Sequence, residues 1–463
     1  MGIIDTGFDL THPMFKDKDG NLRIKGYYEP GSTTLGGDTV FISYNDGQKD
    51  TLSGSAYYKP EELLDTLKVK DVAGSHGSHC ISIAAGSIFS DIKGTAEKPV
   101  GGIAPEADIL ICNNSKSENE NTAWDFMESL YFLESEAVKA EKPLVVSVSQ
   151  NSHWGWHDGK SDMARVIDHF CTMDSVAIML CSSNEGASET YIHEKVKAKE
   201  TLQLIPYTYY TDNYLWGGFK TEKNVKMKIG IANLSEDKEY YRIPVTFNSV
   251  KETKYGQGIY FDFDDGEQEF DTKEEAAAKK EFMKYMTGGQ VMIFCYQNYA
   301  LDQEDNAYPY TEVFVSMTGT EWIETLDPNN DAIFWGFNLY LEPEEDTELH
   351  AWADYGMYVH AVRADGKKVK GSGKVSVGDW NTSGKQVSVG AWCANDKIKY
   401  EGTEAQETGE TLGSIAEFSS YGTDLAGHKH PDVCAPGTNV VAAYNSFDPN
   451  AEDFAIYQRK AYD

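Results

Sequence analysis

The chain has 463 residues, 40% of them hydrophobic and 25% charged, a composition that excludes disordered and collagen-like proteins. Its 74 acidic and 41 basic residues give a net charge of −33, which disfavours nucleic acid and anionic membranes as partners. No apolar run approaches the roughly 20 residues of a membrane-spanning helix, so we expect no membrane span.

Residues 1 to about 190 alternate short apolar runs with helical patterns, which indicates an α/β domain with a parallel sheet. The chain starts inside an apolar strand, with no lead-in. Apolar side chains at helical spacing predict a helix within residues 122–143. The strand expected next, at 144–148, reads as buried on both faces. A second helix, capped by Ser161 or Asp162, precedes another buried strand.

The pattern changes near residue 190. From there to about 372 the sequence is rich in aromatic residues and alternates with period two, as at 225–231 and 337–341. We therefore expect antiparallel sheets that form a sandwich. One helix is predicted at 276–286, and Asp365-Gly366 supplies a hairpin turn. The tryptophans of this region could stack on sugars, but aromatic residues in a sandwich are more often core: Trp216, Trp322, Trp335 and Trp352.

The α/β pattern returns after Ser372, in the apolar runs at 386–391 and 431–433. The simplest interpretation is one α/β domain that a β domain interrupts. We expect the first part of the α/β domain at residues 1–190, the inserted β-sandwich at 191–372, and the second part at 373–463.

The cysteines are dispersed and include no CxxC pair. We expect mostly buried free thiols rather than a disulfide or zinc framework. The seven residues are Cys80, Cys112, Cys171, Cys181, Cys295, Cys393 and Cys434.

Three polar residues stand where chemistry is expected in an α/β sheet, at strand ends and helix starts. Asp5 ends an apolar strand, although an aspartate there is as often a turn former. His76 stands at the entrance to a helix of small residues, beside Gly77; alternatively, His76 and His79 form a metal pair or are core histidines. Asn184 follows a buried strand and can donate a hydrogen bond into the same cleft, or cap a turn.

A fourth strand end is the run Ser147, Val148, Ser149 and Gln150, followed by Asn151, whose backbone is a candidate to pair with an extended ligand. Four strand ends that point at one cleft are more informative than any one of them.

In this combination and order the residues resemble the subtilisin-like serine proteases, the subtilase family (peptidase S8). The motifs that carry the resemblance lie at residues 3–9, 12–15, 75–86, 102–107, 182–186, 418–422 and 430–437. The resemblance implies a subtilisin-like three-layer α/β fold around a parallel sheet, here with a β-sandwich insertion that resembles the jelly-roll-like insertions of some bacterial subtilases.

The resemblance also implies the chemistry, which is peptide hydrolysis by an Asp-His-Ser triad. His76 would be general base and then acid, Asp5 would orient it, and Asn184 would donate to the oxyanion. The strand from Ser147 to Gln150 would bind an extended polypeptide substrate. Gln150-Asn151 stands where the family usually has Leu-Gly, which leaves the shape of the primary pocket open.

One family motif is missing. The family's Gly-Thr-Ser-Met-Ala-like motif, which carries the nucleophile, should follow residues 435–437, and the sequence reaches Asp463 without it. Ser419 and Ser420 belong to an earlier motif, and Ser446 lacks the glycine-rich turn. We favour truncation over a degenerate relative, and we expect this chain to be inactive. The alternatives are a noncatalytic subtilase-like protein that binds a peptide or partner, and a carbohydrate-binding sandwich with an α/β appendage.

The remaining expectations follow from the family. No cofactor is required and no metal ligands are assigned, although many subtilases bind structural calcium; no EF-hand spacing stands out at residues 17–21. The family implies a secreted or cell-surface bacterial protein, although no signal peptide is visible in the sequence. The oligomeric state and the cleavage preference are not predicted.

Overall fold

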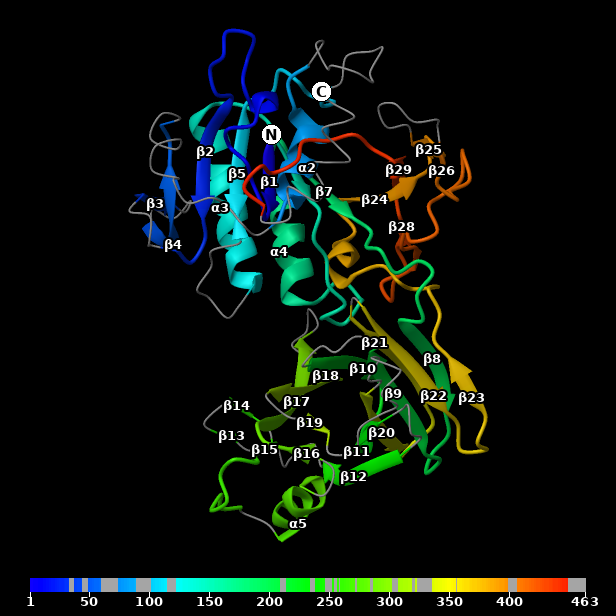
Figure 1. Cartoon of the computed structure of the whole chain (residues 1–463). Helices are drawn as coiled ribbons and strands as arrows, with labels where there is room; N and C mark the ends of the chain where they lie inside the picture. Colours follow the sequence, from blue (N-terminus) through cyan, green and yellow to red (C-terminus); the bar gives the residue numbers. More distant parts are fainter. Residues whose placement is uncertain are drawn as a thin grey trace.

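The computed structural model (Figure 1) describes residues 1–32, 37–43, 49–59, 74–88, 101–114, 122–208, 214–233, 238–245, 252–253, 256–257, 259–270, 273–283, 286–301, 307–318, 321–322, 335–354, 356–398 and 406–448. Two bodies of secondary structure are visible, an α/β body at the top of the figure and a β-rich body below it.

A nine-stranded sheet forms the centre of the upper body, in the order β29-β24-β7-β6-β1-β5-β2-β4-β3. All neighbours from β29 to β2 run parallel, and only β4 and β3 at one edge are antiparallel. The strands are β1 (Gly2–Asp5), β2 (Ile24–Glu29), β3 (Asp38–Ser43), β4 (Lys49–Tyr57), β5 (Ile109–Asn113), β6 (Leu144–Val148), β7 (Val176–Cys181), β24 (Val387–Trp392) and β29 (Val433–Pro436).

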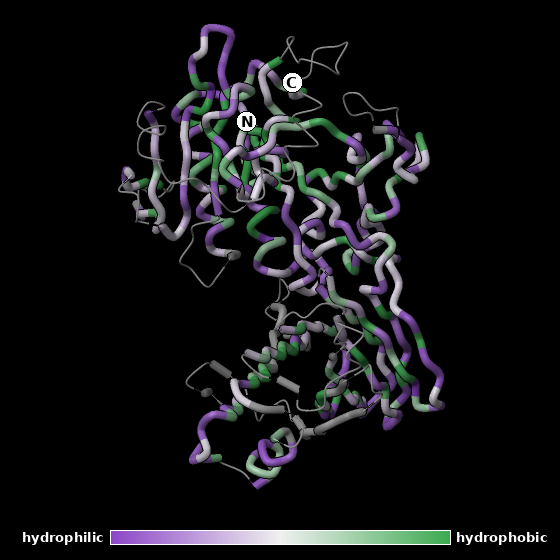
Figure 2. Tube along the Cα trace, in the orientation of Figure 1, coloured by the Kyte–Doolittle hydropathy of each residue, from purple (hydrophilic) through white to green (hydrophobic). Residues whose placement is uncertain are grey.

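Helices cover both faces of this sheet. Successive side chains of a strand point to opposite faces, so Ile3 packs in one apolar cluster with Ile81 of α2 (His76–Ala85). Its neighbour Ile4 packs in another with Phe126 of α3 (Thr122–Lys139) and Ile167 of α4 (Asp162–Cys171). Figure 2 shows apolar segments running through these central strands. The predicted three-layer α/β fold is therefore confirmed.

The predicted helices and strands of this body form for the expected local reasons, with one correction. The hydroxyl of Ser161 caps α4 by accepting from the amide of Ala164 at 3.1 Å. The strand expected to be buried on both faces is β6, but Val145 is 39% exposed. Only the face with Leu144, Val146 and Val148 lies in a core cluster.

The lower body consists of two six-stranded antiparallel sheets, in the orders β15-β17-β18-β10-β21-β8 and β12-β11-β20-β9-β22-β23. Side chains of both sheets share one apolar cluster, so the sheets form the predicted sandwich. The strands are β8 (Tyr191–Val196), β9 (Leu202–Thr208), β10 (Tyr214–Thr221), β11 (Val225–Asn233), β12 (Lys238–Val245), β15 (Ile259–Asp262), β17 (Gln290–Leu301), β18 (Ala307–Thr318), β20 (Trp335–Pro343), β21 (Thr347–Ala353), β22 (Met357–Val362) and β23 (Lys368–Lys370).

Short elements complete the fold. They are η1 (Pro13–Phe15), η3 (Asp379–Ser383), β13 (Glu252–Thr253), β14 (Gly256–Gln257), α5 (Lys273–Phe282), β16 (Met286–Thr287), β19 (Glu321–Trp322), β25 (Lys397–Ile398), β26 (Gln406–Glu407), β27 (Gly422–Thr423) and β28 (Lys429–His430). The helix predicted at 276–286 is α5, which ends earlier, because Met286 already belongs to a strand. The predicted hairpin turn joins β22 and β23, with Gly366 at φ +82°.

Aromatic predictions are confirmed where the structure describes the side chains. Trp216 and Trp352 are buried, and Trp216 belongs to the sandwich core. The side chains of Trp322 and Trp335 lie outside the described residues.

Among the described side chains, six cysteines are free thiols: Cys80, Cys112, Cys171, Cys181, Cys393 and Cys434. Only Cys112 and Cys393 are buried and Cys434 is exposed, so the expectation of mostly buried thiols is wrong for this set. The Cys295 side chain lies outside the described residues. No helix in the described ranges is long and apolar enough to cross a bilayer.

The two bodies are joined by residues 152–158, which we call the docking segment. The imidazole of His157 stacks on the indole of Trp352 at 4.1 Å, and Trp154 stacks on Trp216 at 5.9 Å. The Nζ of Lys220 lies 2.6 Å from the Oδ2 of Asp158, a largely buried ion pair between sandwich and α/β body. A chain segment that follows β6 thus holds the sandwich against the α/β body.

Candidate active site

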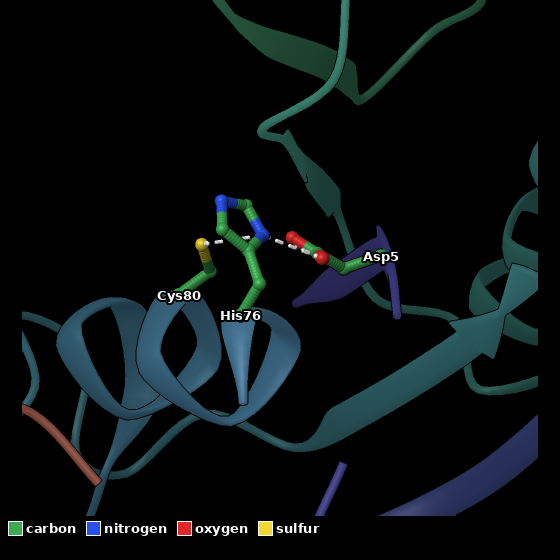
Figure 3. A group of neighbouring side chains, drawn as sticks. All are labelled: Asp5, His76 and Cys80. Carbon is green, nitrogen blue, oxygen red and sulfur yellow. Dashed lines mark hydrogen bonds and ion pairs between the residues drawn. The ribbon is translucent and has the colours of Figure 1, made fainter. Parts of the chain in front are cut away.

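Asp5 and His76 lie together although 70 residues separate them in the sequence. Asp5 is the last residue of β1 and is only 1% exposed, and His76 is the first residue of α2. Figure 3 shows the imidazole beside the carboxylate, with Nδ1 2.7 Å from the Oδ1 of Asp5. The imidazole is 58% exposed, so its opposite edge is open to a substrate.

The loop after β1 is tied to the first turn of α2, and this fixes the pair. The amide of Gly77 donates to the carbonyl of Thr6 at 2.6 Å, and the amide and hydroxyl of Ser78 both donate to the carbonyl of Gly7. The Ser78 hydroxyl also accepts from the amide of Asp9 at 2.8 Å. Ser78, where the family more often has threonine, therefore bridges the loop and the helix.

Gly77 is needed for packing at this junction. A Cβ at this position would lie 2.6 Å from the ring of Phe8 and 2.7 Å from the carbonyl of Thr6. The glycine beside His76 is buried and lets the helix start approach the β1 loop closely.

The hydrogen bond to Asp5 raises the pKa of His76 to about 10, with a smaller contribution from Cys80. The buried carboxylate thus favours the charged imidazolium over the neutral ring. With a pKa near 10 the ring is mostly protonated at neutral pH, so His76 can act as a base only after it loses this proton; Asp5 stabilises the charge that appears when the ring accepts a proton.

Cys80 is a neighbour of this pair that the sequence reasoning missed. Its Sγ lies 3.8 Å from the Nδ1 of His76, and Asp5, His76 and Cys80 form one compact group (Figure 3). The available signal was its spacing, since residues i and i+4 share one face of a helix. The His79 ring lies edge-on to Tyr444 at 6.0 Å, and a metal pair of His76 and His79 stays a prediction.

Only part of the predicted peptide-binding strand end has main-chain groups that are not paired with neighbouring strands. Ser147 is paired with Ile3 of β1 and with Met179 of β7, and Val148 is likewise paired on both sides. Because β6 is an interior strand, the peptide groups of Ser147 and Val148 face neighbouring strands and not a ligand. Only Ser149 and Gln150 lie beyond the strand end, so the expectation is corrected to these two.

Asn184 lies in the loop after β7, the strand next to β6, and it is exposed. Two hydrogen bonds support this loop. The amide of Glu185 donates to the hydroxyl of Ser420 at 2.9 Å, and the amide of Ser420 donates to the carbonyl of Ser183 at 3.1 Å. The Ser419 hydroxyl accepts from the amide of Ala391. Ser420 therefore supports the Asn184 loop, whereas the Ser419 hydroxyl is bound to β24.

The segment at residues 438–448 crosses in front of β1 and α2 (Figure 1). The hydroxyl of Ser446 donates to the Oδ2 of Asp9 at 2.7 Å, and the amide of Asn445 donates to the hydroxyl of Ser75. Over the described ranges, no serine hydroxyl forms a hydrogen bond with His76.

The loop at residues 17–21 is closed by its own groups. The Oδ1 of Asp17 accepts from the amides of Asp19 and Asn21, both at 2.9 Å, and its Oδ2 accepts from the side-chain amide of Asn21. The carboxylate of Asp17 acts as a turn former here, and calcium binding stays a prediction without a site.

Comparisons with known proteins give a match to a protein family and a match in fold. The family model described as Peptidase_S8, Subtilase family, matches residues 1–459. Among solved structures, the chain is similar in fold to the Clostridium perfringens CspB protease, with a TM-score of 0.56 and 18% sequence identity. The match covers 96% of this chain and 76% of the clostridial one. A search of curated proteins gives no match.

Proposed function

Because this chain belongs to the subtilase family of serine peptidases, we propose that Asp5 and His76 are the aspartate and the histidine of an Asp-His-Ser triad that hydrolyses peptide bonds. The observation that supports this most directly is the 2.7 Å contact between the His76 Nδ1 and the buried carboxylate of Asp5. Polypeptides are the substrate class of the family.

The two residues would act in sequence. When His76 is neutral and donates Nδ1–H to Asp5, its Nε2 carries the lone pair that takes the proton from a serine hydroxyl. His76 then returns that proton to the leaving amine. Asp5 keeps the ring in this tautomer and stabilises its charged form.

Asn184 is proposed as the donor to the oxyanion of the tetrahedral intermediate. Its exposed amide follows β7, whose end lies next to the end of β6 in the sheet. Loss of one such donor reduces the rate by about 10²–10³-fold. Ser149 and Gln150, at the end of β6, are proposed to pair with an extended substrate, so that main-chain hydrogen bonds supply affinity.

The nucleophile is the part of the triad that this sequence does not supply. The 463 residues contain no Gly-Thr-Ser-Met-Ala-like motif. The Ser420 hydroxyl donates to Glu185 in the Asn184 loop, the Ser419 hydroxyl accepts from Ala391 of β24, and the Ser446 hydroxyl donates to Asp9. We therefore expect no peptide hydrolysis at enzymatic rates by this chain alone.

The test compares two proteins on fluorescently labelled casein. The first is the 463-residue chain, and the second is the product of the natural reading frame continued past Asp463 to its stop codon. We expect cleavage by the second only, and its loss by at least about 10³-fold in His76→Ala. Cleavage by the 463-residue chain that depends on His76 would show that the nucleophile was misassigned.

A noncatalytic, peptide-binding relative is the second candidate, since no serine hydroxyl contacts His76 in the described residues. A reading frame that stops without a Gly-Thr-Ser-Met-like segment, together with peptide binding that Gln150→Pro abolishes, would establish this alternative and exclude the protease. Glycan retention by the chain would instead favour the carbohydrate-binding interpretation.

We also propose that the protein is secreted or bound to the cell surface of a bacterium, as subtilases often are. It would need no cofactor for catalysis, and any calcium would be structural. Fractionation of the producing cells, with detection of the chain by antibody, tests the location.

A further inference from the structure

The outer face of the sandwich carries three polar side chains that the proposed function does not use. His193 on β8 is directly paired with His350 on the neighbouring strand β21. Glu348 precedes His350 by two residues on β21, and residues two apart on a strand point to the same face. The alternate residues, such as Ile192 and Leu349, are buried in the sandwich core.

These three side chains already converge. The rings of His193 and His350 are stacked at 4.3 Å with planes 8° apart. The Nε2 of His193 lies 3.2 Å from the Oε2 of Glu348. One ligand atom from each of the three residues lies within 4.8 Å of the other two. In a tetrahedral site with bonds of about 2.0–2.1 Å, ligand atoms are about 3.4 Å apart, so only small side-chain rotations are required.

Neighbouring contacts orient two of the three ligands. The Oη of Tyr191 lies 2.7 Å from the Nδ1 of His350, which leaves the Nε2 of that ring for a ligand. The Nζ of Lys195 lies 2.7 Å from the Oε1 of Glu348, which leaves Oε2 on the side of His193. A hydrogen bond on the second ring nitrogen is the usual support of a metal-binding histidine.

The donor set and its exposure define the kind of ion. Two imidazole nitrogens and one carboxylate oxygen suit zinc and its transition-metal neighbours, whereas calcium and magnesium prefer all-oxygen sites. The side chains of His193 and Glu348 are 41% and 45% exposed, so an ion has access from solvent and a water can complete its coordination. The net charge of −33 attracts cations to the molecule.

We propose that His193, Glu348 and His350 form a binding site for a zinc-like divalent transition metal on the outer face of the sandwich. The site joins β8, an edge strand, to β21 and is separate from the Asp5–His76 pair. By linking the edge strand to its neighbour, a bound ion would stabilise the sandwich against fraying at that edge.

A second histidine cluster lies in the turn between β27 and β28, and it supplies the matched control. There the rings of His428 and His430 both contact the Oδ2 of Asp424, at 3.1 and 3.0 Å, and Asp424 and His430 are buried. The carboxylate oxygen is already shared by two imidazoles in an enclosed turn. We therefore expect this cluster to keep its internal hydrogen bonds and to bind metal less readily.

The test titrates the 463-residue chain with Co²⁺, whose visible absorption reports tetrahedral coordination, and follows thermal unfolding with Zn²⁺. We expect one equivalent of Co²⁺ to bind without the sulfur-to-metal charge-transfer band that coordination by Cys80 would produce. The affinity should fall at least tenfold in His193→Gln and in His350→Gln, and it should be retained in His428→Gln. Zn²⁺ should raise the Tm of the unsubstituted chain and of His428→Gln only.

Circular dichroism and the metal-free Tm establish that each variant is folded, which is expected because these side chains lie on an outer face. Absence of Co²⁺ binding by the unsubstituted chain would overturn the proposal. Unchanged affinity in folded His193→Gln and His350→Gln would overturn it as well, as would loss of binding in His428→Gln with retention in His193→Gln.

Discussion

At the scale of single residues, the pKa of His76 is the most direct measure of its contact with Asp5. We expect Asp5→Asn to lower this pKa from about 10 toward the ordinary value of 6.5, because the hydrogen bond to the carboxylate is the largest cause of the increase. Cys80→Ser should lower it by less. Histidine proton shifts in an NMR titration, assigned by comparison with His76→Gln, give the value. An unchanged pKa in Asp5→Asn would mean that the pair is not formed in solution.

The same contact links protein stability to pH. Because the pKa of His76 is higher in the folded chain than in the unfolded chain, protons favour the folded state. The stabilisation is fully present below about pH 6.5 and is lost as the pH rises toward 10. In Asp5→Asn, the unfolding temperature should change less over this alkaline range than in the unsubstituted chain.

Ser78 provides a prediction about stability. Ser78→Ala removes the acceptor for the Asp9 amide and one donor to the carbonyl of Gly7, in a fully buried position. We expect unfolding free energy to fall by about 1–3 kcal/mol. The control is Ser414→Ala, whose partly exposed hydroxyl bonds only Thr411 and which should cost less than about 0.5 kcal/mol. Equal losses in a urea titration would contradict the bridging role of Ser78.

Single residues also show what the sequence could and could not predict. Asp5 and His76 were identified because several motifs occur together and in the order of the family, and the structure brings the two residues into contact. Cys80 was missed because its contact with His76 depends on the spacing of four residues along α2, and the family motif does not single out this position. Ser147 and Val148 were assigned to ligand binding because an isolated strand end looks free, whereas the sheet pairs them on both sides.

At the scale of elements, the junction of β1 and α2 depends on the absence of a side chain at Gly77. Gly77→Ala should lower the unfolding free energy by about 1–3 kcal/mol, since a Cβ there overlaps the Phe8 ring and the Thr6 carbonyl. Gly266→Ala is the control, because a Cβ at this exposed position meets nothing within 4 Å. Thermal unfolding of the two variants measures the difference. A Gly77→Ala protein as stable as Gly266→Ala would exclude the close approach.

Elements with strong periodicity were predictable, and those set by tertiary contacts were not. The amphipathic pattern of α3 and the Ser161 cap of α4 are local signals, and both helices form where expected. The helix after residue 272 was placed too far along the chain, because nothing in its composition shows that Met286 pairs with Trp322 in a short sheet.

At the scale of the whole molecule, Asp379 of η3 is a buried carboxyl that ties the docking segment to the rest of the α/β body. Its Oδ1 accepts from the amide of His157 in the docking segment at 2.8 Å, and its Oδ2 accepts from the hydroxyl of Ser161. Burial raises the pKa of Asp379 to about 7. The folded state therefore holds this proton more tightly than the unfolded chain, and the contribution to stability declines as the pH rises from about 4 to 7.

Asp379→Asn should remove this dependence while it keeps an acceptor for the His157 amide. The unfolding temperature of the variant should vary less between about pH 4 and pH 7 than that of the unsubstituted chain. Asp365→Asn, in the exposed hairpin turn between β22 and β23, is the control and should follow the unsubstituted chain. Identical pH profiles for all three proteins would show that Asp379 does not titrate in this range.

The insertion of the sandwich was predicted from the change in periodicity near residue 190. The contacts that hold the sandwich against the α/β body were not predicted. His157 and Trp352 are nearly 200 residues apart, and no local pattern marks them as partners. Contacts of this kind form when the two folded bodies pack together. A short window of sequence therefore does not predict them. The predicted limits at residues 190 and 372 stay predictions.

The docking segment begins one residue after Asn151, directly downstream of Ser149 and Gln150. The main chain that is proposed to hold a substrate is thus continuous with the segment whose Trp154 and His157 rings stack on Trp216 and Trp352. Because only Asn151 separates the two, we expect a change in the packing of the docking segment on the sandwich to displace Ser149 and Gln150. The contact between the two bodies therefore lies only a few residues from the proposed substrate-binding residues Ser149 and Gln150.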